Sequence, residues 1–454
     1  MKQPRHHTFT ATIEQKIKSG AYPPGHRLPS VREIMAQYRL SATTVQSGYE
    51  HLVISGLVES IPKSGYYVSG TQPVISIPPP VVERDATYLH KLSLITSRHA
   101  GRHASTAFNV AAPGDLLIPQ KLLLRTMQQV IREQGASLLR YDAPTGNASL
   151  RQSISLHLSQ HHTMVHADEL LITDGALQAL YIALAAVCRP GDVVAVESPC
   201  VFSVLEVLQV MHLQVLEIPA PFQPDALEEA CGRLKARAII VTPNFHNPTG
   251  ALLPDAGKQQ LLAIAEKYNV PVIENDVYGD LHFTGQRPSN LKMFDRQGLV
   301  LTYSSFSKTL APGIRLGWLA PGRYYKEAEQ VRFSLGSAVS PVYQAMVQKL
   351  LATGSYQRHV RTFRARLARN AAVTQQLLAA HFPQSTVFSR PEGGYSMWVE
   401  MPAGTDMQRC YEHFTPGYNF TLTASFRHCF RLVFAEPYTP ARKAAIQAAA
   451  QLYR

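Results

Sequence analysis

The sequence predicts an α/β protein in which a small module of short helices and a hairpin precedes a large domain with a mainly parallel sheet. Capped helical segments near the N-terminus indicate the module. From about residue 100, apolar β-branched runs alternate with amphipathic helical patterns, which is typical of a parallel sheet covered by helices. A proline-containing stretch between them predicts an extended connector. We expect the first domain at residues 1–70, the linker at 71–95 and the large domain at 96–454.

The composition excludes several classes of protein. At 454 residues the chain is too long for a single core, and an apolar content of 45% with 17% charged residues excludes global disorder. A formal net charge of +12 permits an anionic partner. The first 70 residues contain eight Lys or Arg against four Glu, so the small module is itself basic.

Cysteine usage and the N-terminal residues indicate the compartment. The five cysteines are widely spaced and form no C-x-x-C pair, which argues against a disulfide framework or a metal site. The first residues lack the apolar core of a secretory signal, and no run reaches the roughly 18 apolar residues of a membrane span. We expect a soluble cytoplasmic protein.

Three helices are expected in the small module. The segment at residues 8–20 has isoleucines one turn apart and a glycine stop signal. Ser30 and Glu33 have the spacing of a capping box, in which each side chain satisfies a backbone N–H of the same turn. Ser41 caps the next helix. Its apolar stripe consists of Val45, Tyr49 and Leu52.

A hairpin follows these helices. Two β-prone runs flank a turn-rich stretch at residues 62–65. Two capped helices joined by a tight turn form a helix-turn-helix, whose second helix enters the DNA major groove, and the hairpin makes the module a winged variant. The sequence therefore predicts a double-stranded DNA operator as a partner.

This module resembles the GntR-type winged-helix regulators, whose sequence pattern it follows from residue 20 to residue 68. The resemblance implies DNA contacts from the second and third helices and from a wing tip at Lys63 and Gly65. The helical positions are Arg32, Ser41, Thr43, Thr44 and Gln46. Ala42 stands where the family usually has arginine, so a strong phosphate or guanine contact is missing there.

Polar residues follow the apolar runs of the large domain, at the strand ends where α/β sheets bind ligands. They include a small-residue turn at Gly175, the segment Asn247-Pro248-Thr249-Gly250, the pair Asp276 and Tyr278, and the group Ser307, Lys308 and Arg315. Pyridoxal phosphate requires a lysine for its aldehyde, a carboxylate for its ring nitrogen, donors to its ring hydroxyl and a phosphate cup rich in N–H groups. The order and spacing of these residues therefore predict pyridoxal 5'-phosphate as cofactor.

Residues 100–454 resemble the class I/II aminotransferases of fold type I, and the fusion to a GntR-like module resembles the MocR subfamily of bacterial regulators. The resemblance implies that Lys308 forms the Schiff base with the cofactor, that Asp276 pairs with the pyridine nitrogen, and that Asn247 and Tyr278 donate to the ring oxygen. It assigns the phosphate to Gly175, Ala176, Ser305, Ser307 and Arg315. Arg431, in the late strand "FRLVFA", would bind a substrate α-carboxylate.

The same resemblance implies a homodimer, because the tyrosine of "LLRYDAPTG", here Tyr141, reaches the cofactor phosphate of the neighbouring subunit in the family. Two positions depart from the family pattern. Val201 replaces an aromatic residue that often stacks on the ring, which leaves Phe202 for stacking, and Asp174 places a carboxylate beside the expected phosphate. The stretch "NVAAPGDLLIP" resembles the substrate-side loop.

Three functions agree with these observations. The chain is a DNA-binding regulator that senses an amino acid or amine through pyridoxal phosphate, an aminotransferase with an accessory DNA-binding module, or a regulator that has lost cofactor chemistry. Lys308 and Asp276 argue against the third, since a chain without the cofactor has no need of either. The fused DNA-binding module favours the regulator over the enzyme, and residual transamination is compatible with it.

Overall fold

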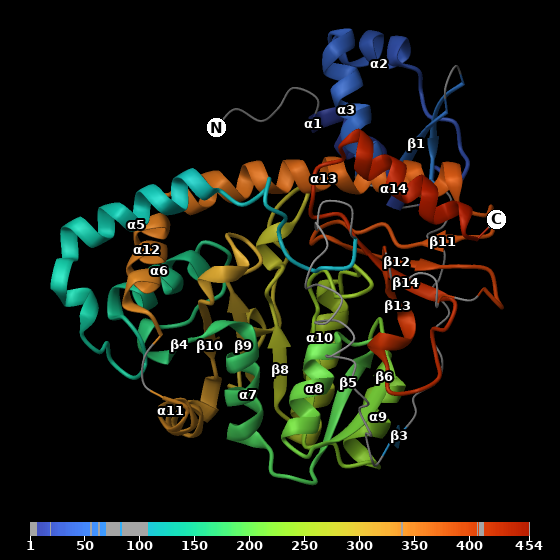
Figure 1. Cartoon of the computed structure of the whole chain (residues 1–454). Helices are drawn as coiled ribbons and strands as arrows, with labels where there is room; N and C mark the ends of the chain where they lie inside the picture. The colour runs from blue at the N-terminus through green and yellow to red at the C-terminus, as the bar shows by residue number, and fades with distance from the viewer. Residues whose placement is uncertain are drawn as a thin grey trace. The chain divides into compact units, whose positions relative to one another are not determined.

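The computed structural model describes residues 7–18, 20–54, 57–61, 64–69, 82–83, 108–336, 339–405, 407 and 413–453. The chain divides into two compact units, Met1–Val74 and Ile75–Arg454 (Figure 1). Lys63, which we expect at the wing tip, lies outside the described residues, as does most of the expected linker. The part of the linker that is described is β3 (Val82–Glu83), which pairs with the sheet of the second unit.

The first unit contains three helices and a hairpin, as expected from the sequence. The helices are α1 (His7–Lys18), α2 (Val31–Tyr38) and α3 (Ala42–Ile54), and the antiparallel hairpin consists of β1 (Val58–Ile61) and β2 (Gly65–Val68). Val45, Tyr49 and Leu52 are buried in its core. Gly48 is required where α3 meets α1, because a β-carbon there would overlap the ring of Phe9.

The caps of α2 and α3 are the predicted ones. Ser30 N–H donates to Glu33 Oε2 (2.6 Å), and Glu33 N–H donates to Ser30 Oγ (3.3 Å), which completes the capping box. Thr44 N–H donates to Ser41 Oγ (3.2 Å) at the start of α3. These bonds satisfy backbone donors that the helix itself leaves free, so both helices begin where the sequence predicts.

The second unit is built on an eight-stranded sheet, in the order β3, β6, β5, β7, β8, β9, β10, β4. After β3, its strands are β4 (Leu171–Thr173), β5 (Val193–Ser198), β6 (Gln214–Pro219), β7 (Ala238–Val241), β8 (Val272–Asn275), β9 (Val300–Ser305) and β10 (Gly317–Ala320). Strands β6, β5, β7, β8 and β9 are parallel. Because β10 is antiparallel to both β9 and β4, β4 runs in the same direction as β9, and its carboxyl end lies at the same sheet edge.

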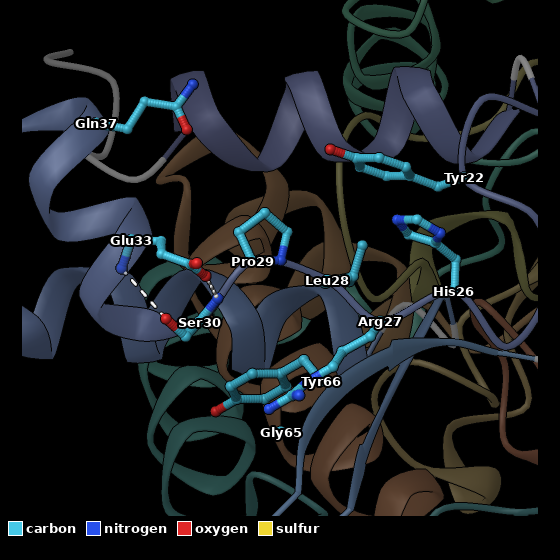
Figure 2. Close-up of a pocket in the computed structure, with 10 residues that line it drawn as sticks. All are labelled: Tyr22, His26, Arg27, Leu28, Pro29, Ser30, Glu33, Gln37, Gly65 and Tyr66. Carbon is cyan, nitrogen blue, oxygen red and sulfur yellow. Dashed lines mark hydrogen bonds between the residues drawn. The ribbon is translucent and has the colours of Figure 1, made fainter.

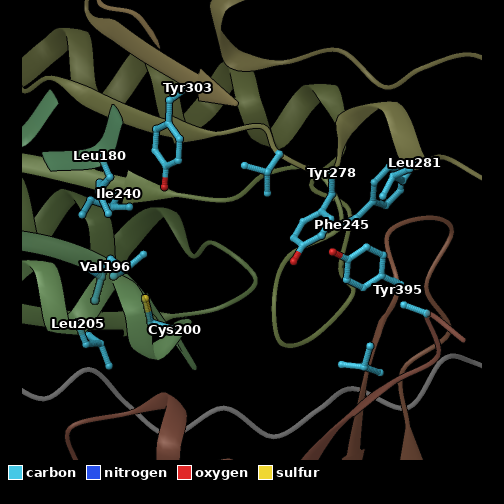
Figure 3. Close-up of a cluster of buried hydrophobic side chains, with 14 of the residues drawn as sticks. Leu180, Val196, Cys200, Leu205, Ile240, Phe245, Tyr278, Leu281, Tyr303 and Tyr395 are labelled. Carbon is cyan, nitrogen blue, oxygen red and sulfur yellow. The ribbon is translucent and has the colours of Figure 1, made fainter. Parts of the chain in front are cut away.

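Helices cover both faces of this sheet. Alternate strand residues point to opposite sides, so Ile240 packs with α7 (Gly175–Val187) and α8 (Phe202–Val210), and Ile239 packs with α9 (Pro224–Gly232) and α10 (Asp255–Tyr268). Figure 3 shows part of the first cluster. Ile172 and Trp318, near the β4 edge, pack with α5 (Gln120–Gln134), α6 (Ala148–Ser159) and α12 (Pro341–Ala352).

A smaller antiparallel sheet completes the unit. Its order is β11 (Val387–Phe388), β12 (Ser396–Glu400), β14 (Cys429–Val433), β13 (Thr415–Pro416). The remaining helices are α11 (Tyr325–Ser334), the 27-residue α13 (Ser355–His381) and α14 (Pro440–Gln451). The loop that begins at Phe108 is tied to this sheet, since Val433 N–H donates to Phe108 O (2.8 Å). Among the described residues, no helix has both the length and the apolarity that a membrane crossing requires.

Candidate cofactor site and DNA-binding surface

Asp276 lies directly after β8 and is 1% exposed. Its Oδ1 accepts a hydrogen bond from Asn244 Nδ2 (3.0 Å), and its Oδ2 forms an ion pair with Arg287 Nη2 (2.5 Å). Its backbone N–H donates to Tyr303 O on β9 (2.9 Å). Adjacent parallel strands and two side chains therefore fix this carboxylate at the carboxyl edge of the sheet.

Lys308 follows β9, at the same edge of the sheet. Its Nζ donates to the carbonyl oxygen of Ala111 (2.6 Å), in the loop before α5. Burial lowers the pKa of Lys308 to about 8, and the positive charges of Arg431 and Arg315 act in the same direction. This amine is therefore neutral in a much larger fraction of molecules near pH 8 than an exposed lysine.

The N-terminus of α7 meets Arg315. Gly175 has a φ of +77°, and a β-carbon there would lie 2.8 Å from Arg315 Nη2, so the close approach requires glycine. Arg315 Nη2 donates to Asp174 O (3.2 Å). Gly317 packs on Gly175 and pairs with Ser305 in the β9–β10 ladder. The small-residue turn, the arginine and the serine-bearing strand end therefore lie together.

The two serines of this region differ in their partners. Ser305 Oγ donates to Leu316 O (3.1 Å) and accepts from Ser307 N–H (3.1 Å). Ser307 is 6% exposed, and its buried Oγ has no hydrogen-bond partner among the described residues. An unpaired buried hydroxyl is costly, and an anion at this point would satisfy it.

Arg431 lies on β14, where it is 2% exposed. It donates from Nη1 to Asn247 Oδ1 (3.1 Å) and from Nη2 to Thr415 Oγ1 (3.2 Å) and the backbone oxygen of Asn109. Its guanidinium lies over the Phe420 ring, 4.9 Å from the centroid. Its Nε is buried and has no acceptor in the described structure. Burial lowers the pKa of Arg431 to about 10, although Tyr278 and Tyr395 oppose the shift.

Asn247, Tyr278 and Tyr395 connect these groups. Asn247 Nδ2 donates to the Tyr278 hydroxyl (3.4 Å), and the Tyr278 and Tyr395 rings meet edge to face with centroids 5.2 Å apart (Figure 3). The Tyr395 hydroxyl donates to Ala111 O (3.2 Å), the oxygen that also accepts from Lys308. The loop predicted as substrate-side therefore contacts both Lys308 and Arg431 through its backbone oxygens.

The structure also locates four other residues singled out from the sequence. Tyr141 is 85% exposed. Phe202 packs in the cluster with Phe420, with ring centroids 6.0 Å apart. Ala176 is half-buried against the main core, and Asp174 is exposed, at the start of α7.

The sequence did not indicate several groups that the structure places here. No sequence pattern marked Arg287 or Tyr395. Asn244 was also not singled out, although it lies only three residues before Asn247. The backbone oxygens of Asn109 and Ala111 have no sequence signal, because any residue could supply them. Only the folded arrangement brings these groups to Asp276, Lys308 and Arg431.

The candidate DNA-binding surface lies on the first unit. Arg32, Ser41, Thr43 and Gln46 are exposed, and Thr44 is half-buried. The hydroxyls of Ser41 and Thr44 are hydrogen-bonded to each other (2.8 Å), so they are already partly engaged in capping α3. Gly65 begins β2 with a φ of +123°.

An open groove of about 650 Å³ runs between the start of α2 and the hairpin (Figure 2). Arg27, the capping-box residues Ser30 and Glu33, and Gly65 and Tyr66 are among its lining residues. Arg27 is exposed. The groove therefore offers a cation beside the wing, a position that the sequence pattern did not indicate.

Two family models match the chain. The aminotransferase class I and II family matches residues 113–442, and the bacterial regulatory proteins of the gntR family match residues 8–68. The HTH-type transcriptional regulator YjiR of Escherichia coli K12 is 32% identical over 457 residues, which cover 98% of this chain and 97% of YjiR. The regulator YdcR of the same strain is 34% identical over 401 residues, covering 87% of this chain and 86% of YdcR.

A solved structure agrees with the fold of the second unit. The α-aminoadipate aminotransferase LysN of Thermus thermophilus, solved with N-(5'-phosphopyridoxyl)-L-leucine, is similar with a TM-score of 0.73 and 25% identity, over 80% of this chain and 94% of LysN. The two matched models together span both structural units. The chain belongs to the aminotransferase class I and II family and, by its N-terminal gntR-family domain and its near full-length match to YjiR, to the HTH-type transcriptional regulators of MocR type.

Proposed function

We propose that this protein is a transcriptional regulator that binds an operator through its winged helix, holds pyridoxal 5'-phosphate at Lys308, and responds to an amino acid or amine. One observation supports this most directly: Lys308 and the buried Asp276 follow adjacent strands of the large sheet, and the buried Arg431 of the small sheet lies near enough to lower the pKa of Lys308, in a chain that also has a gntR-family domain.

The residues present fit pyridoxal phosphate. Ser307 Oγ and Arg431 Nε are buried polar atoms without partners in the described structure, one beside the expected phosphate cup and one beside the expected carboxylate site. Gly175 leaves the space in front of Arg315 free of a side chain. The comparison structure LysN was solved with a phosphopyridoxyl amino acid, which supports the same ligand chemistry here.

Each residue has a role that its surroundings permit. Pyridoxal phosphate supplies an aldehyde that condenses with amines and a ring that withdraws electrons. Lys308 provides a neutral amine near pH 8. Asp276 holds a negative charge at the ring nitrogen, Asn247 and Tyr278 donate to the ring oxygen, and Arg315 with Ser305, Ser307 and the Gly175–Ala176 backbone binds the phosphate.

Arg431 binds the effector carboxylate. A planar guanidinium is suited to a carboxylate, and the charge-assisted bond is strong in a desolvated site. Asn247, Thr415 and the backbone oxygen of Asn109 engage three of the five N–H donors of Arg431, which leaves Nε–H and one Nη1–H for a carboxylate. An effector that binds one arrangement of the two units more tightly than another shifts the population toward the first. The resulting change in DNA affinity is limited by the difference between the effector's two affinities.

We further propose a homodimer, in which the exposed Tyr141 reaches the cofactor phosphate of the other subunit. Tyr141 is 85% exposed and Leu139, two residues before it, is 89% exposed, and two large apolar side chains exposed so close together support a partner at this point. A two-fold symmetric protein would present two winged helices to an operator with two half-sites.

The test combines absorbance with DNA binding. Purified protein with pyridoxal phosphate is titrated with a panel of amino acids and amines, and its affinity for operator DNA is measured by mobility shift with and without each compound. We expect the compound that changes the cofactor spectrum to change the DNA affinity. Identical DNA affinity with and without every such compound would contradict the proposal.

Transamination is a second candidate function, because Lys308, Asp276, Tyr278 and Arg431 meet in one site and an aromatic-amino-acid aminotransferase of Thermococcus litoralis is 24% identical over 73% of this chain and 83% of that protein. The same absorbance titration distinguishes an effector-sensing regulator from an active aminotransferase. Conversion of bound cofactor to its amine form, with release of a keto acid, would identify an active aminotransferase.

A further inference from the structure

Arg287 is a buried cation between two carboxylates. Its side chain is 4% exposed, and it pairs with Asp276 Oδ2 through Nη2 (2.5 Å) and with Asp280 Oδ1 through Nε (2.8 Å). Asp276 and Asp280 lie on either side of Gly279, at the turn that follows β8. One guanidinium therefore joins Asp276 to a second carboxylate, Asp280.

Asp280 is itself held from the opposite side. Its Oδ2 accepts hydrogen bonds from His157 Nε2 on α6 (3.0 Å) and from the Tyr356 hydroxyl on α13 (2.6 Å). Burial alone would raise the pKa of Asp280, but His157 and Arg287 hold it well below its usual range. Asp280 is therefore an anion, anchored to two helices.

The packing leaves little space for a ligand at this cluster. A β-carbon at Gly279 would overlap Asp276 Oδ1 and the Arg287 guanidinium, so the pair lies directly against the backbone. The cavity between Asp276, Asp280 and Arg287 is about 20 Å³, enough for about one water molecule. His161 approaches His157, but Asp280 already has three donors, which argues against a metal ion there.

The charges explain why two carboxylates are needed. A lone arginine beside Asp276 would neutralise it and repel a second cation, such as a protonated ring nitrogen. Asp280 balances Arg287, so Asp276 keeps its negative charge toward the site. Among the described residues, Glu274 and Lys258 interact with each other and with Asp276, and Arg364 interacts with Asp280. His161 and His282 interact with both Asp280 and Arg287.

We propose that Arg287, balanced by Asp280, is a positioning residue that orients Asp276 and preserves its charge for the ring nitrogen of the cofactor. This inference rests on the proposed function, since it requires that the site binds pyridoxal phosphate. It predicts that the loss of cofactor affinity on replacing Arg287 depends on the presence of the ring nitrogen. A purely structural effect would be the same with and without that nitrogen.

The experiment compares two ligands on the full-length apoprotein. One is pyridoxal phosphate, and the other is 1-deazapyridoxal phosphate, which has carbon in place of the ring nitrogen. Dissociation constants are measured for the wild type, Arg287→Gln, Asp280→Asn and Arg332→Gln. Arg332 is a matched control, because it is a buried arginine that bonds to Ile172 O and Gly336 O and does not contact Asp276.

We expect Arg287→Gln to weaken binding of pyridoxal phosphate by about tenfold or more, and of the deaza analogue by less than about threefold. Asp280→Asn should act in the same direction, because Arg287 then cancels the charge of Asp276. Asparagine at position 280 keeps a side-chain oxygen that can accept from Arg287. The Asp280→Asn variant therefore still tests the inference if Arg287→Gln does not fold. Arg332→Gln should not discriminate between the ligands.

Equal weakening of both ligands by Arg287→Gln or by Asp280→Asn would overturn the inference and assign the cluster a structural role alone. Unchanged affinity for both ligands would overturn it as well. Failure of the wild type to bind either ligand would instead contradict the proposed function, so the two failures are distinguishable.

Discussion

Arg431 donates a hydrogen bond from Nη1 to Oδ1 of Asn247, over 3.1 Å, and so joins strand β14 of the small sheet to the loop after β7. Because the amide oxygen of Asn247 is engaged, its Nδ2 is directed to the Tyr278 hydroxyl. The group that we expect to bind an effector carboxylate therefore also determines the amide orientation at the ring-oxygen side of the site.

Arg431→Gln should weaken binding of an amino-acid effector by about tenfold to a hundredfold, because a buried charge-assisted hydrogen bond is lost. Binding of the corresponding amine without a carboxylate should change far less. Absorbance titration of the cofactor-loaded protein with both compounds measures this difference. Arg427→Gln is the control, since Arg427 is exposed and its Nε donates to the backbone oxygen of Ala424. An equal loss for acid and amine would show that Arg431 does not bind the carboxylate.

Lys308→Ala should abolish the borohydride-stable covalent link to the cofactor. Lys258→Ala, which removes a lysine that is 1% exposed, should retain it. Peptide mapping of the reduced protein locates the adduct. A borohydride-stable adduct in Lys308→Ala would refute the assignment.

The capture of pyridoxal phosphate by the wild-type apoprotein should also depend on pH. Only the neutral amine attacks the aldehyde, and the pKa of Lys308 is lowered from 10.5 to about 8. The capture rate should therefore rise with pH to a midpoint near 8. Arg431→Gln removes a nearby positive charge, so it should move that midpoint upward. Stopped-flow absorbance measures the rate, and a midpoint near 10 in the wild type would contradict the prediction.

Gly175→Ala should weaken cofactor affinity, because a β-carbon would displace the Arg315 guanidinium from the N-terminus of α7. Gly191→Ala provides a matched control, since Gly191 also has a positive φ (+90°) but a β-carbon there would meet no atom within 4 Å. Both variants have backbone strain, and only the first has the overlap. Equal affinities in the two variants would place the phosphate elsewhere.

Tyr141→Phe and Lys308→Ala should complement each other in mixed dimers. A mixed dimer contains one site with both an intact Lys308 and an intact Tyr141, so about a quarter of all sites should recover tight binding after equal mixing. Titration of the mixed and unmixed proteins with pyridoxal phosphate measures the recovery. No recovery in dimers shown to have exchanged subunits would contradict the assignment of Tyr141 to its neighbour's site.

Arg32→Ala should weaken binding to all DNA sequences and reduce the salt slope of the affinity by about one, because Arg32 is exposed at the start of α2. The measurement is DNA affinity over a series of salt concentrations. Arg369→Ala, at an exposed position of α13 in the second unit, should leave the slope unchanged. An unchanged slope in Arg32→Ala would place Arg32 away from the DNA backbone.

Local patterns predicted much of this structure. The capping box at Ser30 and Glu33 and the cap at Ser41 are short-range signals, so the helix starts could be derived without the fold. The order of apolar runs and polar strand ends indicated a mainly parallel sheet with Lys308 and Asp276 at one edge. Strand β10 lies antiparallel between β9 and β4, and it was not among the predicted strands.

The sequence by itself determined the two classes of domain, the family resemblance and the residue types of the site, because these depend on local spacing and on motifs. Only the tertiary structure decided which other groups meet them. His157 and Tyr356 lie 123 and 76 residues from Asp280 in the chain, and a backbone oxygen such as that of Ala111 can belong to any residue type. Their convergence depends on strand order and helix packing, which long-range burial of apolar surface establishes and which no local pattern specifies.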